Sequence, residues 1–100
     1  MPLYLDEIWL PQDPPDALKR ALTAFTALAH GEASYPAGVT VTAGPWFSNE
    51  EAKLVLILDI ADHSTTFPAF AMGMANNLMV RRRLSPLVAW PAVERFLASL

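Results

Sequence analysis

The sequence contains no cysteine, which excludes disulfide bonds, thiolate catalysis and thiolate metal ligation. Charged residues make up only 17% of the chain, and the formal net charge is -3. Nucleic-acid binding requires a basic face, so this balance argues against a nucleic-acid partner. The chain has only four glycines, and no phosphate-cradling loop, dinucleotide fingerprint or Ser-His-Asp order is present.

The sequence also lacks the pattern of a secretory signal or of a membrane span. Asp6 and Glu7 interrupt the apolar N-terminal segment, which has no basic start. The longest uncharged run, residues 64–80, contains Pro68 and Gly73 and is short for a span of about 20 apolar residues. We therefore expect a cytoplasmic protein that makes no contact with a membrane.

Apolar residues, in contrast, are abundant and make up 53% of the sequence. A chain of 100 residues buries one hydrophobic core, so we expect a single domain over residues 1–100. A small domain has a large surface for its volume, and this much apolar sequence leaves apolar surface that needs a partner. The composition therefore favours an oligomer.

The spacing of apolar and turn-forming residues predicts a mixture of strands and helices. Asp13 and Pro14 are typical of a helix start, and Gly31 is typical of a helix stop. Thr65 or Thr66 is the expected N-cap of a second helix, which would end near residues 81–83, where positive charge is favourable. The complete pattern predicts strands at residues 2–10, 39–47, 53–60 and 84–90, and further helices at residues 14–30 and 91–100.

The faces of these strands indicate how they are arranged in a sheet. Strands 2–10 and 53–60 are apolar on both faces, strand 39–47 has a threonine face, and Pro86 restricts strand 84–90 to an edge. These features match the split βαβ order, in which the first and third strands are central. We therefore expect an α+β, ferredoxin-like βαββαβ domain with an antiparallel four-stranded sheet and a short C-terminal helix.

Two helices cover only one face of such a sheet, yet the central strands are apolar on both faces. The simplest cover for the second face is the sheet of a second copy, which predicts a C2 homodimer. The alternatives are that the C-terminal helix or an unrelated partner lies over this face.

With this element order and these doubly apolar strands, the chain resembles the dimeric α+β barrel superfamily. The resemblance runs from residue 3 to about residue 90 and involves architecture, without a signature motif. The resemblance implies a homodimer. Within that superfamily, the chain is most similar to the small uncharacterised domains. The superfamily also includes monooxygenases that use no cofactor, isomerases and haem enzymes.

Two isolated polar residues are the candidates for catalysis. Asp6 and Glu7 point to opposite faces of one strand, and each is the only carboxylate on an otherwise apolar face. Such a group marks either a site, for which Glu7 is the candidate, or an ion pair with an arginine such as Arg83. His63 is either a general base or a solvated loop residue, and His30 is expected to interact with a helix C-terminus.

The candidates for a ligand pocket are aromatic or basic. Trp9 and Trp46 lie near strand ends and would line either a pocket for a flat ligand or an ordinary core or interface. Arg83 belongs to a three-arginine cluster that either binds an anion or ends a helix. The two histidines have no metal-binding spacing, so we expect neither a metal nor another cofactor.

These observations favour a small dimeric domain with a binding or accessory role, whose ligand would be a small apolar or aromatic compound. The architectural resemblance leaves open a second hypothesis, a cofactor-independent monooxygenase- or isomerase-like enzyme acting on a small aromatic or lactone-like compound. A third hypothesis is an interaction module whose open sheet face is covered by a different protein.

Overall fold

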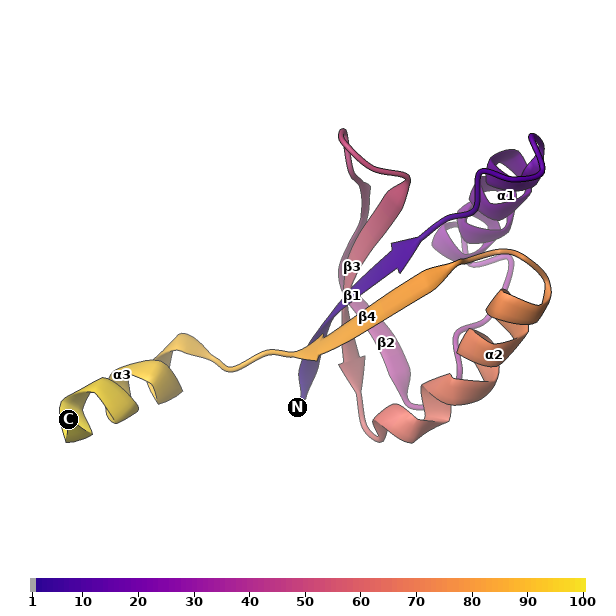
Figure 1. The fold of residues 1–100 in the computed structure, drawn as a ribbon. Helices are drawn as coiled ribbons and strands as arrows, with labels where there is room; N and C mark the ends of the chain where they lie inside the picture. Colours follow the sequence, from indigo (N-terminus) through magenta and orange to yellow (C-terminus); the bar gives the residue numbers. More distant parts are fainter. Residues whose placement is uncertain (1) are drawn as a thin grey trace.

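The computed structural model describes residues 2–100 and has an α+β fold in which helices pack on one face of a four-stranded antiparallel sheet (Figure 1). This confirms the predicted α+β class and the four-stranded antiparallel sheet. A short 3-10 helix, η1 (His63–Thr66), leads into the second helix. Along the chain the elements are β1 (Leu3–Trp9), α1 (Ala17–Ala29), β2 (Val39–Phe47), β3 (Lys53–Ile60), α2 (Phe67–Ala75), β4 (Arg81–Pro86) and α3 (Trp90–Ser99).

The strand order is β2-β3-β1-β4, so the two strands with two apolar faces are central. Residues alternate between the two faces of the sheet. The buried side chains of β1 and β3 on the helix-covered face are Asp6, Ile8, Leu54, Leu56, Leu58 and Ile60. The residues between them lie on the opposite face. None of the helices described in residues 2–100 covers this face, and we call it the open face.

The edge strand β2 is irregular, with register shifts on both sides of Ala43. Gly44 has a φ of +92°, and an added Cβ there would lie 3.0 Å from the carbonyl oxygen of Val55. Only glycine combines this backbone conformation with so close an approach to the neighbouring strand. The bulge therefore depends on Gly44.

The first helix begins later than the sequence predicts. Helix α1 starts at Ala17 with Asp16 as its N-cap, whereas residues 14–16 form a turn closed by the Ala17 N–H and the Pro14 carbonyl. A residue that precedes proline is disfavoured in the α region, and Pro15 follows Pro14 directly. The prediction that Asp13 caps this helix is therefore wrong.

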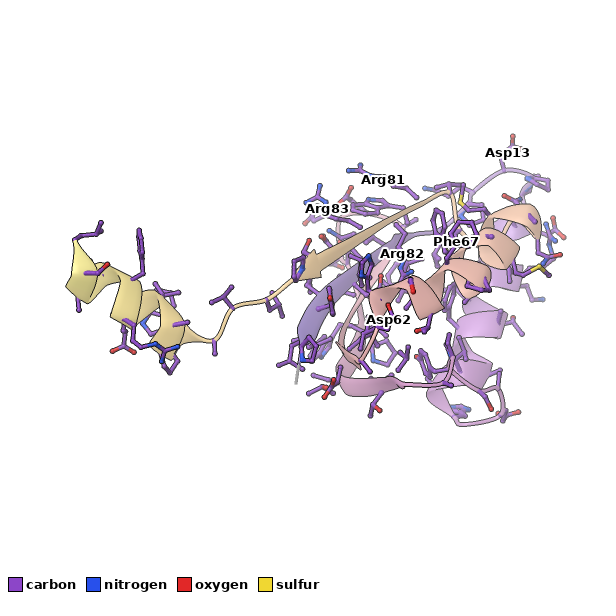
Figure 2. All side chains as sticks on the ribbon, turned by 90° about the horizontal axis from the view of Figure 1, so that it is seen from below. Asp13, Asp62, Phe67, Arg81, Arg82 and Arg83 are labelled. Carbon is purple, nitrogen blue, oxygen red and sulfur yellow. The ribbon has the colours of Figure 1, made fainter. Side chains whose placement is uncertain are left out.

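The three arginines do not end a helix, because they form the first half of β4. Helix α2 already ends at Ala75, and Asn77 has a φ of 53° in the turn that follows. Figure 2 shows Arg82 on the side of β4 that faces α2, and Arg81 and Arg83 on the other side. The strand predicted at residues 84–90 therefore begins and ends earlier in the chain, at Arg81–Pro86. Ion pairs of Arg82 with Asp6 and of Arg83 with Glu7 stabilise this charged strand.

The C-terminal helix α3 stands apart from the rest of the molecule (Figures 1 and 2). An extended segment of residues 87–89 separates it from β4. Its large apolar side chains Trp90, Phe96 and Leu97 are each more than 60% exposed. None of the helices described within residues 2–100 is long and apolar enough to cross a membrane.

Candidate functional site

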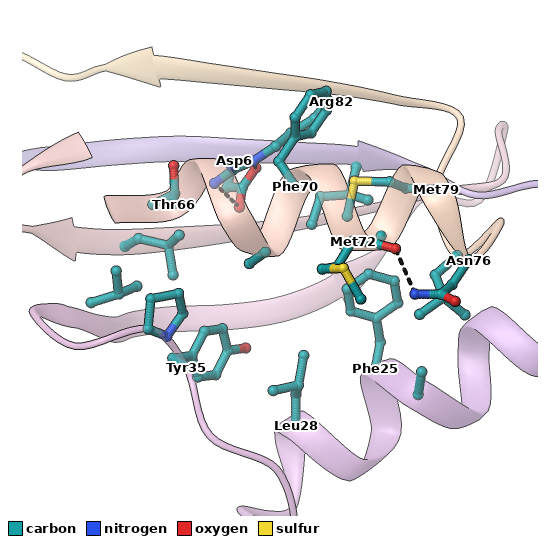
Figure 3. Close-up of a pocket in the computed structure, with 18 of the residues that line it drawn as sticks. Asp6, Phe25, Leu28, Tyr35, Thr66, Phe70, Met72, Asn76, Met79 and Arg82 are labelled. Atoms are coloured by element: carbon teal, nitrogen blue, oxygen red, sulfur yellow. Dashed lines mark hydrogen bonds and ion pairs between the residues drawn. The ribbon is translucent and has the colours of Figure 1, made fainter. Parts of the chain in front are cut away.

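A cavity of about 230 Å³ lies between the helix-covered face of the sheet and the helices α1 and α2 (Figure 3). Helix α1 contributes Ala24, Phe25 and Leu28 to its wall. The α2 side of the wall includes Phe70 and Met72, and Met72 is 61% exposed. The cavity therefore has largely apolar walls.

The charged groups of the cavity wall form one ion pair, between Asp6 of β1 and Arg82 of β4 (Figure 3). The Nε atom of Arg82 donates a hydrogen bond of 2.9 Å to Asp6 Oδ1, and its Nη2 atom donates one of 3.1 Å to Oδ2. The Asp6 side chain is only 4% exposed, and the Arg82 side chain is 12% exposed. This two-point geometry fixes both side chains and supplies a carboxylate and a guanidinium at the cavity.

The register of the sheet explains why these two residues meet. In the β1–β4 pair, Asp6 lies opposite Leu84, so Arg82 is its diagonal neighbour on the same face. Since Arg82 sits between two arginines in a strand, its neighbours Arg81 and Arg83 necessarily point to the open face. One arginine of the three therefore reaches the cavity.

Burial raises the pKa of the Asp6 carboxyl, although the hydrogen bonds and the charge of Arg82 oppose this effect. Burial also raises the pKa of Tyr35, a second polar residue that lines the cavity, and the negative charge of Asp6 adds to that rise. The Tyr35 hydroxyl therefore remains protonated at neutral pH and can donate a hydrogen bond. Together these residues offer both donors and acceptors to a bound molecule.

The raised pKa of Asp6 predicts a definite pH dependence of stability. The folded protein binds this proton more tightly than the unfolded chain. The contribution of the proton to stability is therefore complete below the usual pKa of 3.8 and is lost as the pH rises through the folded-state pKa. We expect the free energy of unfolding of the parent protein to fall over this window relative to that of Asp6→Asn, which cannot ionise.

Urea unfolding of both proteins over a series of pH values measures this difference directly. Titrating groups that do not interact with Asp6 contribute equally in the two proteins, so their contributions cancel in the comparison. A difference that grows in favour of the parent protein as the pH rises would contradict the expected sign.

A second polar cluster lies on the open face and is centred on Trp9. The cationic groups of Lys53, Arg81 and Arg83 lie 5.0, 4.4 and 5.9 Å from the centre of its ring system. Lys53 Nζ also lies 3.1 Å from Glu7 Oε2, and this contact raises the pKa of Lys53. This cluster forms one end of the open face, which also carries Asp59 opposite Leu3 and Ser85 opposite Leu5.

The structure thus separates the residues that the sequence singles out. Glu7, Trp9 and Arg83 lie together on the open face, and the Arg83 Nη1 atom is 3.7 Å from Glu7 Oε1. Trp46 lies on the same face, opposite Val55 of β3, and is 57% exposed. His63 is exposed in η1, and its ring is tilted 33° against Tyr4 at a centroid distance of 6.3 Å.

None of these five candidates lines the cavity between the sheet and the helices. Of the polar residues that line it, Asp6 was noted as an isolated carboxylate, whereas Arg82 and Tyr35 were not predicted as site residues. The alternation of side chains in β1 indicates that Asp6 and Glu7 face opposite sides. Only the packing of the helices on one face of the sheet shows which of those sides faces the cavity.

Within residues 2–100, no three His, Asp or Glu side chains lie close enough together to hold a metal ion. Comparisons with protein-family models, with curated proteins and with solved structures gave no match to this chain.

Proposed function

We propose that this protein is a homodimeric binding domain with the ferredoxin-like, dimeric α+β barrel architecture. Its ligand would be a small, largely apolar organic compound that carries one hydroxyl or carbonyl group. The observation that carries this proposal is the cavity of about 230 Å³ with apolar walls and the buried Asp6–Arg82 pair.

The size and chemistry of the cavity support this class of ligand. An apolar cavity of about 150 Å³ accommodates benzene, so a cavity of about 230 Å³ suits a somewhat larger compound, such as one with two fused rings. A ligand hydroxyl can donate to the Asp6 carboxylate or accept a hydrogen bond from Tyr35. Phe25 and Phe70 provide aromatic contact for a flat ring.

The open face of the sheet supports the homodimer. Leu3, Leu5, Val55 and Ile57 form its apolar centre, and they would face water in an isolated chain. Packing the same face of a second copy against them removes this surface from water, as a C2 interface requires. The strand order β2-β3-β1-β4 is consistent with the proposed architecture.

Filling the cavity tests the proposed binding site. Ala24→Phe places an aromatic ring in the wall of the cavity, and we expect it to weaken the binding of 2-naphthol at least tenfold relative to the parent protein. Ala29→Phe introduces the same ring at an exposed position of α1 outside this cavity, and we expect unchanged affinity.

Fluorescence or calorimetric titration measures the affinity, and circular dichroism confirms that both variants are folded. If the parent protein binds 2-naphthol without saturation, or if both variants bind as the parent does, the cavity is not the binding site. If saturable binding is lost in Ala24→Phe alone, the proposal stands.

A second candidate function, an isomerase-like enzyme, is favoured by one observation. Asp6 is a carboxylate that borders an apolar cavity, and burial shifts its pKa toward neutrality, as a general base requires. In such a reaction Asp6 would take a proton from one carbon of a lactone-like substrate and return it to another. Incorporation of deuterium from heavy water into small lactones, lost in Asp6→Asn, would favour this function over binding alone.

A further inference from the structure

The C-terminal helix α3 has an apolar side that none of the other residues described, within 2–100, covers. Trp90, Val93, Leu97 and Leu100 recur at helical spacing, and Phe96 lies beside them. Trp90, Phe96, Leu97 and Leu100 are between 64% and 83% exposed. Arg95 and Ser99 lie on the other side of the helix, and Glu94 lies at the border of the apolar side. This is the pattern of a helix that packs against a surface, yet Figure 1 shows α3 far from the sheet and from the other helices.

The chain that carries α3 is held in place up to Leu87, whose N–H donates a 2.8 Å hydrogen bond to the carbonyl of Leu3. Only Val88 and Ala89 then precede the helix, and Ala89 is extended. To cover the open face of its own sheet, α3 would have to reverse its direction within these two residues. A second copy, in contrast, can meet the helix along the direction it already takes.

We propose that residues 87–100 form an arm that packs across the homodimer interface, with the apolar side of α3 against the rim of the partner's open face. This inference rests on the homodimer proposed above. By two-fold symmetry each copy gives one arm and receives one, so the two contacts are identical.

The area available on the sheets supports a role for the arms. With strands about 4.8 Å apart and a rise of about 3.3 Å per residue, a four-stranded face six residues long covers roughly 380 Å². Two such faces in contact bury roughly 760 Å², whereas specific, stable interfaces bury at least about 1,200 Å². The sheets alone therefore fall short of a stable dimer.

The two arms make up the difference. The ten residues of α3 form a helix about 15 Å long and about 10 Å wide, so one arm adds roughly 300 Å² when both contacting surfaces are counted. Two arms bring the total to roughly 1,400 Å², which is within the standard range. The open face and the apolar side of α3 together are thus large enough for a stable dimer.

The test compares Leu97→Lys, which places a charge on the apolar side of α3, with Ser99→Lys, which places the same charge on its polar side. Each dimer would bury two Leu97 side chains, so we expect Leu97→Lys to raise the dimer dissociation constant about 100-fold. Ser99→Lys should leave it within about twofold. Sedimentation velocity over a dilution series of the full chain measures both, and circular dichroism verifies that each variant is folded.

The remaining outcomes separate this inference from the proposed homodimer. If Leu97→Lys dimerises as tightly as the parent protein, the arm does not cross the interface, although the homodimer stands. If Leu97→Lys dimerises more tightly, α3 shields its own sheet in solution, and the inference is overturned. A parent protein that is monomeric throughout the dilution series would overturn both proposals.

Discussion

Asp6→Ala is expected to lower the free energy of unfolding by about 3 kcal/mol, because it leaves the guanidinium of Arg82 without its partner in the interior. The substitution removes both hydrogen bonds of the pair and leaves a void beside the cavity. Urea unfolding followed by circular dichroism measures the loss. Asp6→Asn should cost less, because it retains an oxygen acceptor and because burial already disfavours the charged carboxylate.

Two further variants establish that the loss comes from the unpaired charge. Arg20→Ala breaks the exposed ion pair with Asp16 and should change stability little. The double variant Asp6→Leu with Arg82→Met replaces the buried pair by apolar groups of similar size. It should be within about 1 kcal/mol of the parent protein. If the double variant is as unstable as Asp6→Ala, the unpaired guanidinium is not the cause.

Gly44→Ala is expected to destabilise the fold by about 3 kcal/mol, combining backbone strain with a steric clash. The new Cβ would lie 3.0 Å from the Val55 carbonyl oxygen and 3.1 Å from the Leu56 Cα. These are backbone atoms of the central strand β3, so they cannot move aside as a flexible side chain would. Thermal and urea unfolding measure the loss.

Gly31→Ala is the matched control, because Gly31 also has a positive φ, of +75°, but an added Cβ there meets no atom within 4 Å. Its cost should therefore be limited to the backbone conformation, about 1 kcal/mol. Equal losses at the two positions would show that the close approach of β2 to β3 contributes nothing to the cost at Gly44.

Asp6 and Gly44 differ in how far the sequence alone predicts their structural roles. The sequence alone shows a carboxylate within an apolar strand. Because burying an unpaired charge is costly, this carboxylate belongs either to a site or to an ion pair with an arginine. Which arginine pairs with Asp6 depends on strand register, which links residues 76 positions apart in the chain. The requirement for glycine at Gly44 depends on a bulge against β3, and no local pattern predicts it.

The sequence by itself determined the α+β class, the central place of the two strands with two apolar faces, and the presence of a C-terminal helix. These follow from local periodicity, because an alternation of period two or a helical repeat records which faces of an element are buried. The boundary errors at α1 and β4 have local causes of another kind. Consecutive prolines shift the start of α1 to Ala17. Arginines are accommodated in β4 because Arg82 pairs with Asp6 of the neighbouring strand.

Only the tertiary structure decided where the chemistry lies. It directs Asp6 and Arg82 toward the cavity while it collects Glu7, Trp9 and Arg83 on the open face. It also leaves α3 without a packing partner among the other elements of the described chain. The physical reason is that a side chain's environment is set by the elements that pack over it, and those elements come from distant parts of the sequence.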